Sequence, residues 1–440
     1  MIVKYLNLLK SLIIIYPLSI LLFSCSIQKQ ISRSAQQVIK DSSLLTAHVG
    51  ISIYDPEKNK YLYNYQGDKY FVPASNTKLP TCYAAMKYLG ENLRGLDYLE
   101  TDTVLFIRPT ADPTLLHRDF KSQPVFEYLI LVNKKLAFVT PKWEAEVYGN
   151  GWAWSDYNET YMPERNDLPV YGNVIEYSLQ QNGKKYNLQG DIEFFRYALN
   201  PYVDPLTPNI RIRRRRVDNT FDVFSSSGTF TKAKVPFRTF ENQRLLEDTL
   251  KKAWLTDVYP PADYNFKTIY SRPTDSLLKP MMHRSDNFFA EQVLLMVSNE
   301  KFGVMNDEKI IDTLLKTDFK DLPQKPRWAD GSGLSRYNLF TPQDFVAILN
   351  KMKNEFGMER IKVILPTGGT GTISNYYKAD SNYIFAKTGT LSGVVAFSGY
   401  LYTKKGKLLI FSTLVNNHQS SATAVRRAVE KFLQGIRNKY

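Results

Sequence analysis

Residues 72–79 read VPASNTKL and place a serine, Ser75, three positions before a lysine, Lys78. An apolar stretch follows and predicts a helix that ends near Gly90. A spacing of three residues puts the Ser75 hydroxyl and the Lys78 amine on one helical face, within hydrogen-bonding reach. The helix dipole, burial and a second cation nearby can each lower the pKa of such a lysine until it accepts a proton. Ser-x-x-Lys also arises often by chance, and an exposed first helical turn is the competing interpretation.

Two further motifs lie later in the chain. Residues 285–287 are Ser-Asp-Asn and open a predicted helix over 285–297, so ordinary N-capping is their alternative role. Residues 387–390 are Lys-Thr-Gly-Thr and precede a predicted strand over 394–400. The glycine lets a substrate lie against the strand, while lysine and threonine can hold a carboxylate. A solvent-facing hairpin is the alternative for this third motif.

The order of the three motifs, each in its expected structural context, resembles that of the active-site-serine penicillin-binding proteins and β-lactamases. Ser285 follows Ser75 by 210 positions, a gap far longer than in compact β-lactamases. An insertion at this point resembles the class C low-molecular-mass penicillin-binding proteins, the D-Ala-D-Ala carboxypeptidase/endopeptidase family. The resemblance covers residues 45 to 435 and includes four flanking segments: ADPTL at 111–115, GWAW at 151–154, VPFR at 235–238 and DGSGLSR at 330–336.

The resemblance implies a serine-type peptidase that acts on peptidoglycan stem peptides, binds β-lactams and uses no cofactor or metal. It implies that Ser75 attacks the carbonyl of the penultimate D-alanine and that Lys78 is the general base. Ser285 would relay a proton to the leaving amine with help from Lys387, and Asn287 would hold the substrate amide.

The resemblance also implies the substrate contacts. Thr388, together with the lysine before it, would bind the terminal carboxylate beside Gly389. The N–H of Thr390 would share the oxyanion hole with that of the nucleophile. Arg336 would either contact substrate carboxylates or support the site. Asp112 would either reach the diamino-acid end of the stem peptide or stabilise the turn before a proline.

The sequence predicts an α+β fold: a β-lactamase/transpeptidase-like domain, which is an antiparallel sheet flanked by helices, with a β-rich insertion between the first and second motifs. Alternating residues at 48–54 and 61–63 predict a β-hairpin. The predicted segments are a signal peptide over 1–24, a first transpeptidase-like part over 26–96, the insertion over 97–255 and a second transpeptidase-like part over 256–440.

Short aromatic runs predict the strands of the insertion, which is expected to be all-β, and longer patterns predict the other elements. The expected strands of the insertion include 104–107, 192–195 and 223–224. The other expected elements are helices over 341–353 and 422–433 and a strand over 408–412.

The chain has 440 residues, 43% of them hydrophobic and 13% aromatic, which excludes disordered, collagen-like and coiled-coil classes. A net charge of +14 favours anionic partners without choosing among nucleic acid, lipid headgroups and carboxylate-rich polymers. The run Arg211–Arg216 invites a nucleic-acid interpretation, but wall carboxylates or lipid phosphates suit an exported protein better, and a solvated strand face is the simpler alternative. We therefore predict no nucleic-acid partner. The four histidines are scattered, without metal-ligand spacing.

The N-terminus predicts export. An apolar run over 11–24 is too short to span a bilayer comfortably, and LFSC at 22–25 resembles a bacterial lipobox. We expect Cys25 to be diacylated and to anchor a periplasmic protein to a membrane. A plain secretory signal or a short anchor is the alternative. Only Cys82 would then remain, which excludes an internal disulfide, and we assign it to packing.

Two rival functions share these features. A β-lactamase on the same scaffold would release penicillin rapidly, and a non-catalytic wall-binding or β-lactam-sensing lipoprotein would not need Lys78 beside Ser75. Pro80 stands where the family usually has an aliphatic residue, but proline costs little in a first helical turn. The sequence leaves the oligomeric state open.

Overall fold

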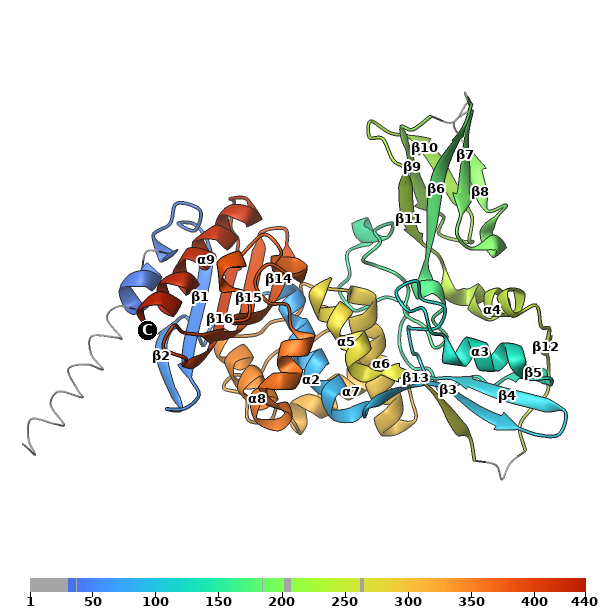
Figure 1. Ribbon diagram of the computed structural model, residues 1–440, viewed down its shortest axis with the longest axis horizontal. Helices are drawn as coiled ribbons and strands as arrows, with labels where there is room; N and C mark the ends of the chain where they lie inside the picture. Colours follow the sequence, from blue (N-terminus) through green and yellow to red (C-terminus); the bar gives the residue numbers. More distant parts are fainter. Residues whose placement is uncertain (1–30, 37, 184, 202–206, 262–264) are drawn as a thin grey trace, which may run out of the picture. The chain divides into compact units, whose positions relative to one another are not determined.

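The computed structural model describes residues 31–36, 38–183, 185–201, 207–261 and 265–440 (Figure 1). The predicted signal peptide over 1–24 and the predicted lipid attachment at Cys25 lie outside the described residues. The predicted α+β fold is confirmed. The chain divides into two compact units: unit 1 comprises Met1–Asn76, Asp321–Arg327 and Asn338–Tyr440, and unit 2 comprises Thr77–Lys320 and Trp328–Tyr337.

Unit 1 contains a five-stranded antiparallel sheet built from both ends of the chain. The predicted hairpin of β1 and β2 is confirmed, and β1 pairs on its other side with β16. The order across the sheet is β14 (Ile384–Leu391), β15 (Val394–Tyr402), β16 (Leu408–Asn416), β1 (His48–Asp55) and β2 (Lys60–Tyr65). The third motif therefore lies on an edge strand, β14.

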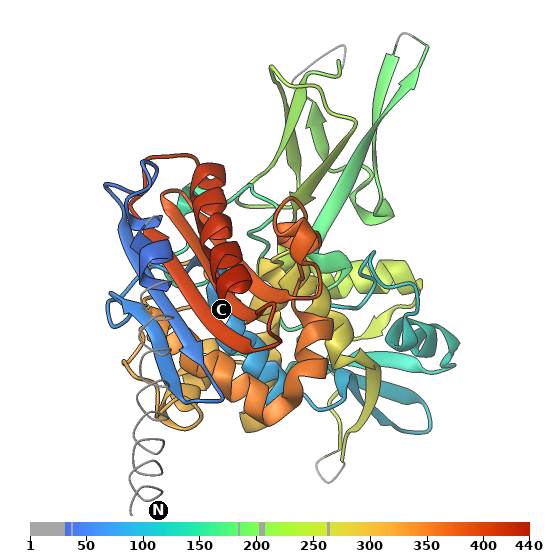
Figure 2. The same ribbon diagram turned by 60° about the vertical axis from the view of Figure 1, so that its left-hand side comes forward.

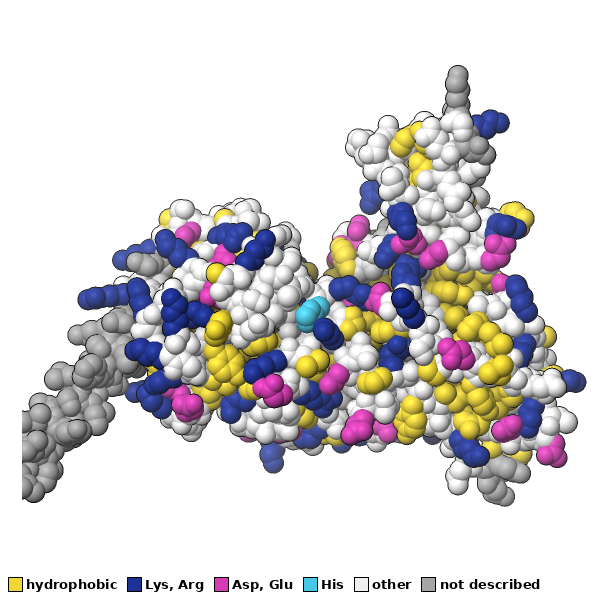
Figure 3. Space-filling model, in the orientation of Figure 1, with side chains coloured by type: hydrophobic (Ala, Val, Ile, Leu, Met, Phe, Trp, Pro, Cys, Tyr) yellow, Lys and Arg dark blue, Asp and Glu magenta, His cyan; other side chains and the backbone are white. Residues whose placement is uncertain are grey.

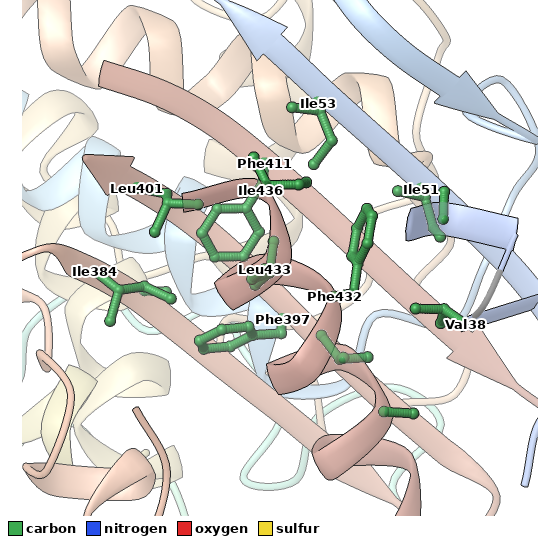
Figure 4. Close-up of a cluster of buried hydrophobic side chains, with 14 of the residues drawn as sticks. Val38, Ile51, Ile53, Ile384, Phe397, Leu401, Phe411, Phe432, Leu433 and Ile436 are labelled. Carbon is green, nitrogen blue, oxygen red and sulfur yellow. The ribbon is translucent and has the colours of Figure 1, made fainter. Parts of the chain in front are cut away.

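Helices cover both faces of this sheet. On one face, α9 (Ala422–Lys439) packs Phe432, Leu433 and Ile436 against Phe397 of β15 (Figure 4). Because side chains alternate along a strand, Tyr400 of β15 points to the other face, where its hydroxyl donates to Leu349 O at 2.7 Å. Leu349 belongs to α8 (Pro342–Ile364), which extends past the predicted end at 353 through a break at Gly357 (φ 74°).

The helices of unit 2 surround α6 (Asn287–Phe302), eleven of whose residues are buried. The segment η1 (Ala74–Thr77), a single 3₁₀ turn, belongs to unit 1 except for its last residue and runs directly into α2. Pro80 lies in the first turn of α2, as expected. The other helices of this group are α2 (Lys78–Tyr88), α5 (Thr274–His283) and α7 (Asp307–Lys316).

The described residues between the first two motifs form three sheets in unit 2 (Figure 2). The five-stranded sheet has the order β12 (Trp254–Leu255), β5 (Lys135–Phe138), β4 (Val104–Pro109), β3 (Asn92–Glu100) and β13 (Lys267–Pro273). The two three-stranded sheets have the orders β8 (Leu199–Pro201), β10 (Phe221–Ser225), β9 (Ile210–Arg214) and β11 (Lys232–Pro236), β6 (Val174–Asn182), β7 (Lys185–Gly190). The boundaries at 97 and 255 stay a prediction; the sheet of β3 and β13 extends past both.

Two details of the predicted insertion are wrong. The expected strand over 192–195 is instead a 3₁₀ turn, η4 (Glu193–Phe195), because Phe195 turns inward to pack against the ring of Phe237 at 5.0 Å. The region is also not all-β, since it contains α3 (Pro124–Leu131) and α4 (Asn242–Leu250). None of the helices in the described ranges combines the length and the apolar character needed to cross a membrane.

Candidate active site

Lys78, the first residue of α2, has a fully buried side chain. Its Nζ donates at 2.7 Å to Asn287 Oδ1 and at 2.7 Å to the carbonyl oxygen of Ser332. All three residues belong to unit 2. Two hydrogen-bond acceptors therefore orient the amine: Asn287 Oδ1 of the second motif and the Ser332 carbonyl of the DGSGLSR segment.

Burial lowers the pKa of Lys78 from 10.5 to about 8, because desolvation penalises the ammonium form. The nearby carboxylates of Asp330, Glu291 and Asp286 oppose this shift. A substantial fraction of this lysine is therefore neutral at slightly alkaline pH and can accept a proton.

A buried polar network supports the Ser332 peptide. The N–H of Ser332 donates to Glu291 Oε1 at 2.8 Å. Arg165 Nη1 lies 3.3 Å from Glu291 Oε2 and 2.6 Å from Asp307 Oδ2, and all three charged groups are buried. Burial and Asp330 raise the pKa of Glu291, against the lowering effect of Arg165. This network connects the Lys78 amine, through Ser332 and Glu291, to Arg165, which lies in the region between the first and second motifs.

None of the three motifs predicts this network. Asp330 accepts from the N–H groups of Gly333 at 2.8 Å and Ser335 at 2.6 Å, which shapes the DGSGLSR segment. One available signal was a glutamate, Glu291, in the middle of an otherwise apolar helix, since such a charge is buried only with a partner.

The second motif forms the turn between α5 and α6. Ser285 has a left-handed backbone with φ 61°, and Asp286 caps α6 by accepting from Phe289 N at 3.0 Å. N-capping, the alternative role for this motif, thus describes Asp286. Asn287 connects the start of α2 with the region between the first two motifs. Its Oδ1 accepts from Lys78, and its Nδ2 donates to Tyr161 O at 3.0 Å.

In unit 1, Ser75 lies in η1, which is anchored to the sheet. The Asn76 amide donates to Ser398 Oγ at 2.7 Å, and Ser398 shares a hydrogen bond of 2.8 Å with Ser412. Asn416 also holds Val72, two residues before η1, with hydrogen bonds of 2.8 and 3.0 Å to the Val72 backbone. The turn that carries Ser75 is therefore attached to β15 and β16.

The third motif approaches this turn closely within unit 1. A Cβ added at Gly389 would lie 2.6 Å from Pro73 O and 3.0 Å from Ser75 N. Only glycine permits that backbone approach. Lys387 is buried and its Nζ donates to Thr388 O at 2.7 Å, while Thr388 Oγ1 donates to Thr372 at 2.8 Å. Thr390 accepts a hydrogen bond from Arg426.

The structure therefore brings Ser75 together with Gly389 of the third motif in unit 1, and Lys78 together with Asn287 of the second motif in unit 2. Arg336 is exposed at the end of the DGSGLSR segment.

Asp112 is buried, and its two oxygens accept from Thr114 N and Thr114 Oγ1, both at 3.0 Å. Burial raises the pKa of Asp112. This geometry favours the turn-stabilising role over contact with substrate.

The arginine run 211–216 splits between surface and interior. In β9, Arg211 and Arg213 are exposed, but Arg214 is buried and donates through Nε to Tyr157 O at 2.7 Å. Arg214 therefore has a structural role and is not part of an exposed basic surface. Figure 3 shows Lys and Arg side chains scattered over the visible face, interspersed with acidic ones, without a single basic patch.

Among the described residues, no group of three or more His, Cys, Asp or Glu could hold a metal ion.

Residues 31–436 match the D-Ala-D-Ala carboxypeptidase 3 (S13) family of peptidases. The chain belongs to this family. The resemblance predicted from the three motifs is confirmed, and the chain is a serine-type D-Ala-D-Ala carboxypeptidase, a hydrolase of the penicillin-binding protein class.

Two D-alanyl-D-alanine carboxypeptidases align with this chain over most of their length. D-alanyl-D-alanine carboxypeptidase DacB of Haemophilus influenzae is 23% identical over 90% of each chain. The D-alanyl-D-alanine carboxypeptidase of Actinomadura sp. (strain R39) is 26% identical over 89% of this chain and 82% of its own. The fold resembles the crystal structure of penicillin binding protein 4 (dacB) from H. influenzae, with a TM-score of 0.72 and 20% identity over 92% of this chain and 98% of that one. That protein was also crystallised in complex with a β-lactam.

We expect Gly389→Ala to slow acylation by penicillin by at least about tenfold, because an added methyl group pushes the Ser75 backbone out of place. The rate is measured by stopped-flow labelling with a fluorescent penicillin. Gly435→Ala is the matched control, since its added Cβ would lie no closer than 3.6 Å to Ser34 Oγ. Equal rates for the two variants would contradict the role assigned to Gly389.

Proposed function

We propose that this S13 peptidase releases D-alanine from peptidoglycan stem peptides, or cuts D-alanyl cross-links, through an acyl-enzyme on Ser75. The observation that carries the proposal is the buried amine of Lys78, whose pKa lies near 8, three residues after a serine held against the Lys-Thr-Gly strand. A pure binding module has no use for a lysine that burial prepares as a base.

In the first step, Ser75 Oγ forms a bond to the carbonyl carbon of the penultimate D-alanine while Lys78 takes the hydroxyl proton. The carbonyl oxygen becomes an oxyanion held by the N–H groups of Ser75 and Thr390, a contribution on the order of 3–4 kcal/mol per donor. The C–N bond then breaks, and the proton passes from Lys78 through Ser285, assisted by Lys387, to the departing amine of D-alanine.

In the second step, water adds to the Ser75 ester, transfers a proton to Lys78 and regenerates the serine hydroxyl as the peptide acid leaves. Asn287 holds the substrate amide, and Lys387 with Thr388 binds the terminal carboxylate. The edge position of β14 suits this role, because an edge strand can take up an extended peptide as a further strand. Arg336 is exposed, and we assign it to contact with a second carboxylate of the stem peptide.

The decisive experiment maps the site of penicillin attachment. The protein is incubated with a fluorescent penicillin, digested and analysed by mass spectrometry, with Ser75→Ala as the control. We expect one adduct, on the peptide that contains Ser75, and D-alanine release from a pentapeptide substrate. Attachment elsewhere would overturn the assignment, release of the adduct within seconds would indicate a β-lactamase, and labelling without D-alanine release would indicate a sensor.

The rate of acylation should follow the ionisation of Lys78. Because only the neutral amine accepts a proton, the rate should fall about tenfold per pH unit below the Lys78 pKa of about 8 and level off above it. The second-order rate constant of penicillin labelling, measured from pH 5.5 to 9.5, tests this. A rate that stays flat from pH 6 to 8 would contradict a base with this pKa.

We further propose that the chain is exported to the periplasm and anchored to a membrane through a lipid on Cys25. The support for this comes from the lipobox-like residues 22–25 and the short apolar run before them. The wall substrate proposed above lies in the same compartment.

A further inference from the structure

The turn that carries Ser285 is conformationally unfavourable. Ser285 has φ 61°, in the left-handed region that costs free energy for any residue with a side chain. The turn lies between the C-terminus of α5 and the N-terminus of α6. Neighbouring groups must therefore hold Ser285 in place.

The guanidinium of Arg284 connects this turn to a loop that is distant in sequence and contains Asp119. Its Nη2 donates to Asp286 Oδ2 at 3.2 Å, and its Nη1 donates to Asp119 Oδ2. The same guanidinium lies over the ring of Phe289 in α6, 5.6 Å from its centroid. Arg284 and Asp286 flank Ser285 on both sides, so the contact with Asp119 acts on both neighbours of the serine.

The loop that presents Asp119 is itself held firmly. At its start, Asp112 closes a turn by accepting from Thr114. Further along, the His117 ring lies 4.9 Å from that of Phe289, and its Nδ1 accepts from Asp119 N at 3.2 Å. Burial lowers the pKa of His117 to about 4, so the ring is neutral and Arg284 is the closest full positive charge facing Asp119.

A cavity of about 220 Å³ borders this ion pair. Arg284, Asp286 and Asp119 lie on its wall, and Thr160 and Lys234 line it as well. The neighbours of Ser285 in the turn, Arg284 and Asp286, therefore border open space on this side. The ion pair of Arg284 with Asp119 is a contact that restrains the turn here.

We propose that Asp119 is a positioning residue for the reaction: through Arg284 it holds the left-handed Ser285 turn in the geometry that delivers a proton to the leaving amine. This inference rests on the proposed function, and it assigns a role in catalysis to a residue of the region between the first two motifs. The role assigned to Asp119 is indirect, because it acts through its contact with Arg284.

The proposal predicts selectivity for the leaving group. An amide nitrogen must be protonated before the C–N bond breaks, whereas a thiolate departs from a thioester without a proton. Displacing Ser285 should therefore slow acylation by an acyl-D-Ala-D-Ala peptide much more than acylation by the matching thioester.

The test compares Asp119→Asn with the unsubstituted full-length protein on both substrates, with kcat/KM for each and the thermal midpoint of unfolding. We expect kcat/KM for the amide to fall roughly tenfold and that for the thioester to change less than twofold. Asp119→Glu, which keeps the charge, should restore at least half of the amide activity. Asp191→Asn is the matched control, because Asp191 pairs at 3.0 Å with Arg118, another cation of the same cavity, whereas Arg284 pairs with Asp119 and Asp286.

Equal losses on the two substrates, or no loss on either, would overturn the inference, and so would an equal amide defect in Asp191→Asn. If the unsubstituted protein formed no acyl-enzyme on Ser75 with the thioester, the proposed function itself would fail, and this inference with it.

Discussion

Acylation by penicillin should fall by about 10³-fold when Lys78 is replaced by arginine, because a guanidinium stays protonated and cannot act as a base. The neutral variant Lys78→Met should show the same loss, since it also lacks an amine. Lys78→Met also removes the donor that Asn287 Oδ1 and Ser332 O share, whereas the guanidinium of Lys78→Arg still carries N–H donors. Single-turnover labelling with a fluorescent penicillin measures the effect, and thermal unfolding checks that each variant is folded.

Lys87→Arg is the matched control for this experiment. Lys87 lies nine residues further along α2 and pairs with Asp318 at 2.5 Å near the surface. Its replacement should leave the acylation rate within twofold. A Lys78→Arg variant that labels as fast as this control would refute the role of Lys78 as the base.

Arg165→Met should lower the free energy of unfolding by about 3–5 kcal/mol, because it leaves the carboxylates of Glu291 and Asp307 buried without their cation. It also removes the donors that Arg165 supplies to Glu146 O at 2.8 and 3.1 Å. Urea unfolding followed by tryptophan fluorescence provides the measurement.

Two comparison variants separate this effect from the loss of any arginine. Arg196→Met removes an exposed ion pair with Glu193 and should cost less than about 0.5 kcal/mol. The double variant Arg165→Met/Glu291→Gln should recover part of the loss, because one unpaired carboxylate is gone. An Arg165→Met variant as stable as Arg196→Met would contradict the importance of the buried network.

Much of the fold was predictable because its signals are local. The strands at 48–54 and 394–400 and the helix from 422 follow hydrophobic periodicity, which a short window of sequence contains. The error at 192–195 has the same origin: aromatic residues favour strands, but the burial of Phe195 beside Phe237 favours a turn. Tertiary packing, and not local β-propensity, therefore determined the conformation of residues 192–195.

The candidate site was predictable only as far as its motifs reach. The three motifs supplied the residues that we expect to react. The groups around them were not predictable, because Arg165 lies 126 residues before Glu291 and no local pattern joins them. The carbonyl of Ser332 is a backbone group, which residue identity does not specify.

The order in which the sheet of unit 1 is assembled has a consequence for biosynthesis. Its first strand, β1, pairs with its last, β16, so a ribosome must have made almost the whole polypeptide before the sheet can close. The turn around Ser75 is fastened to side chains at 398 and 416. A nascent or truncated chain that lacks β15 and β16 therefore carries Ser75 without these anchoring contacts.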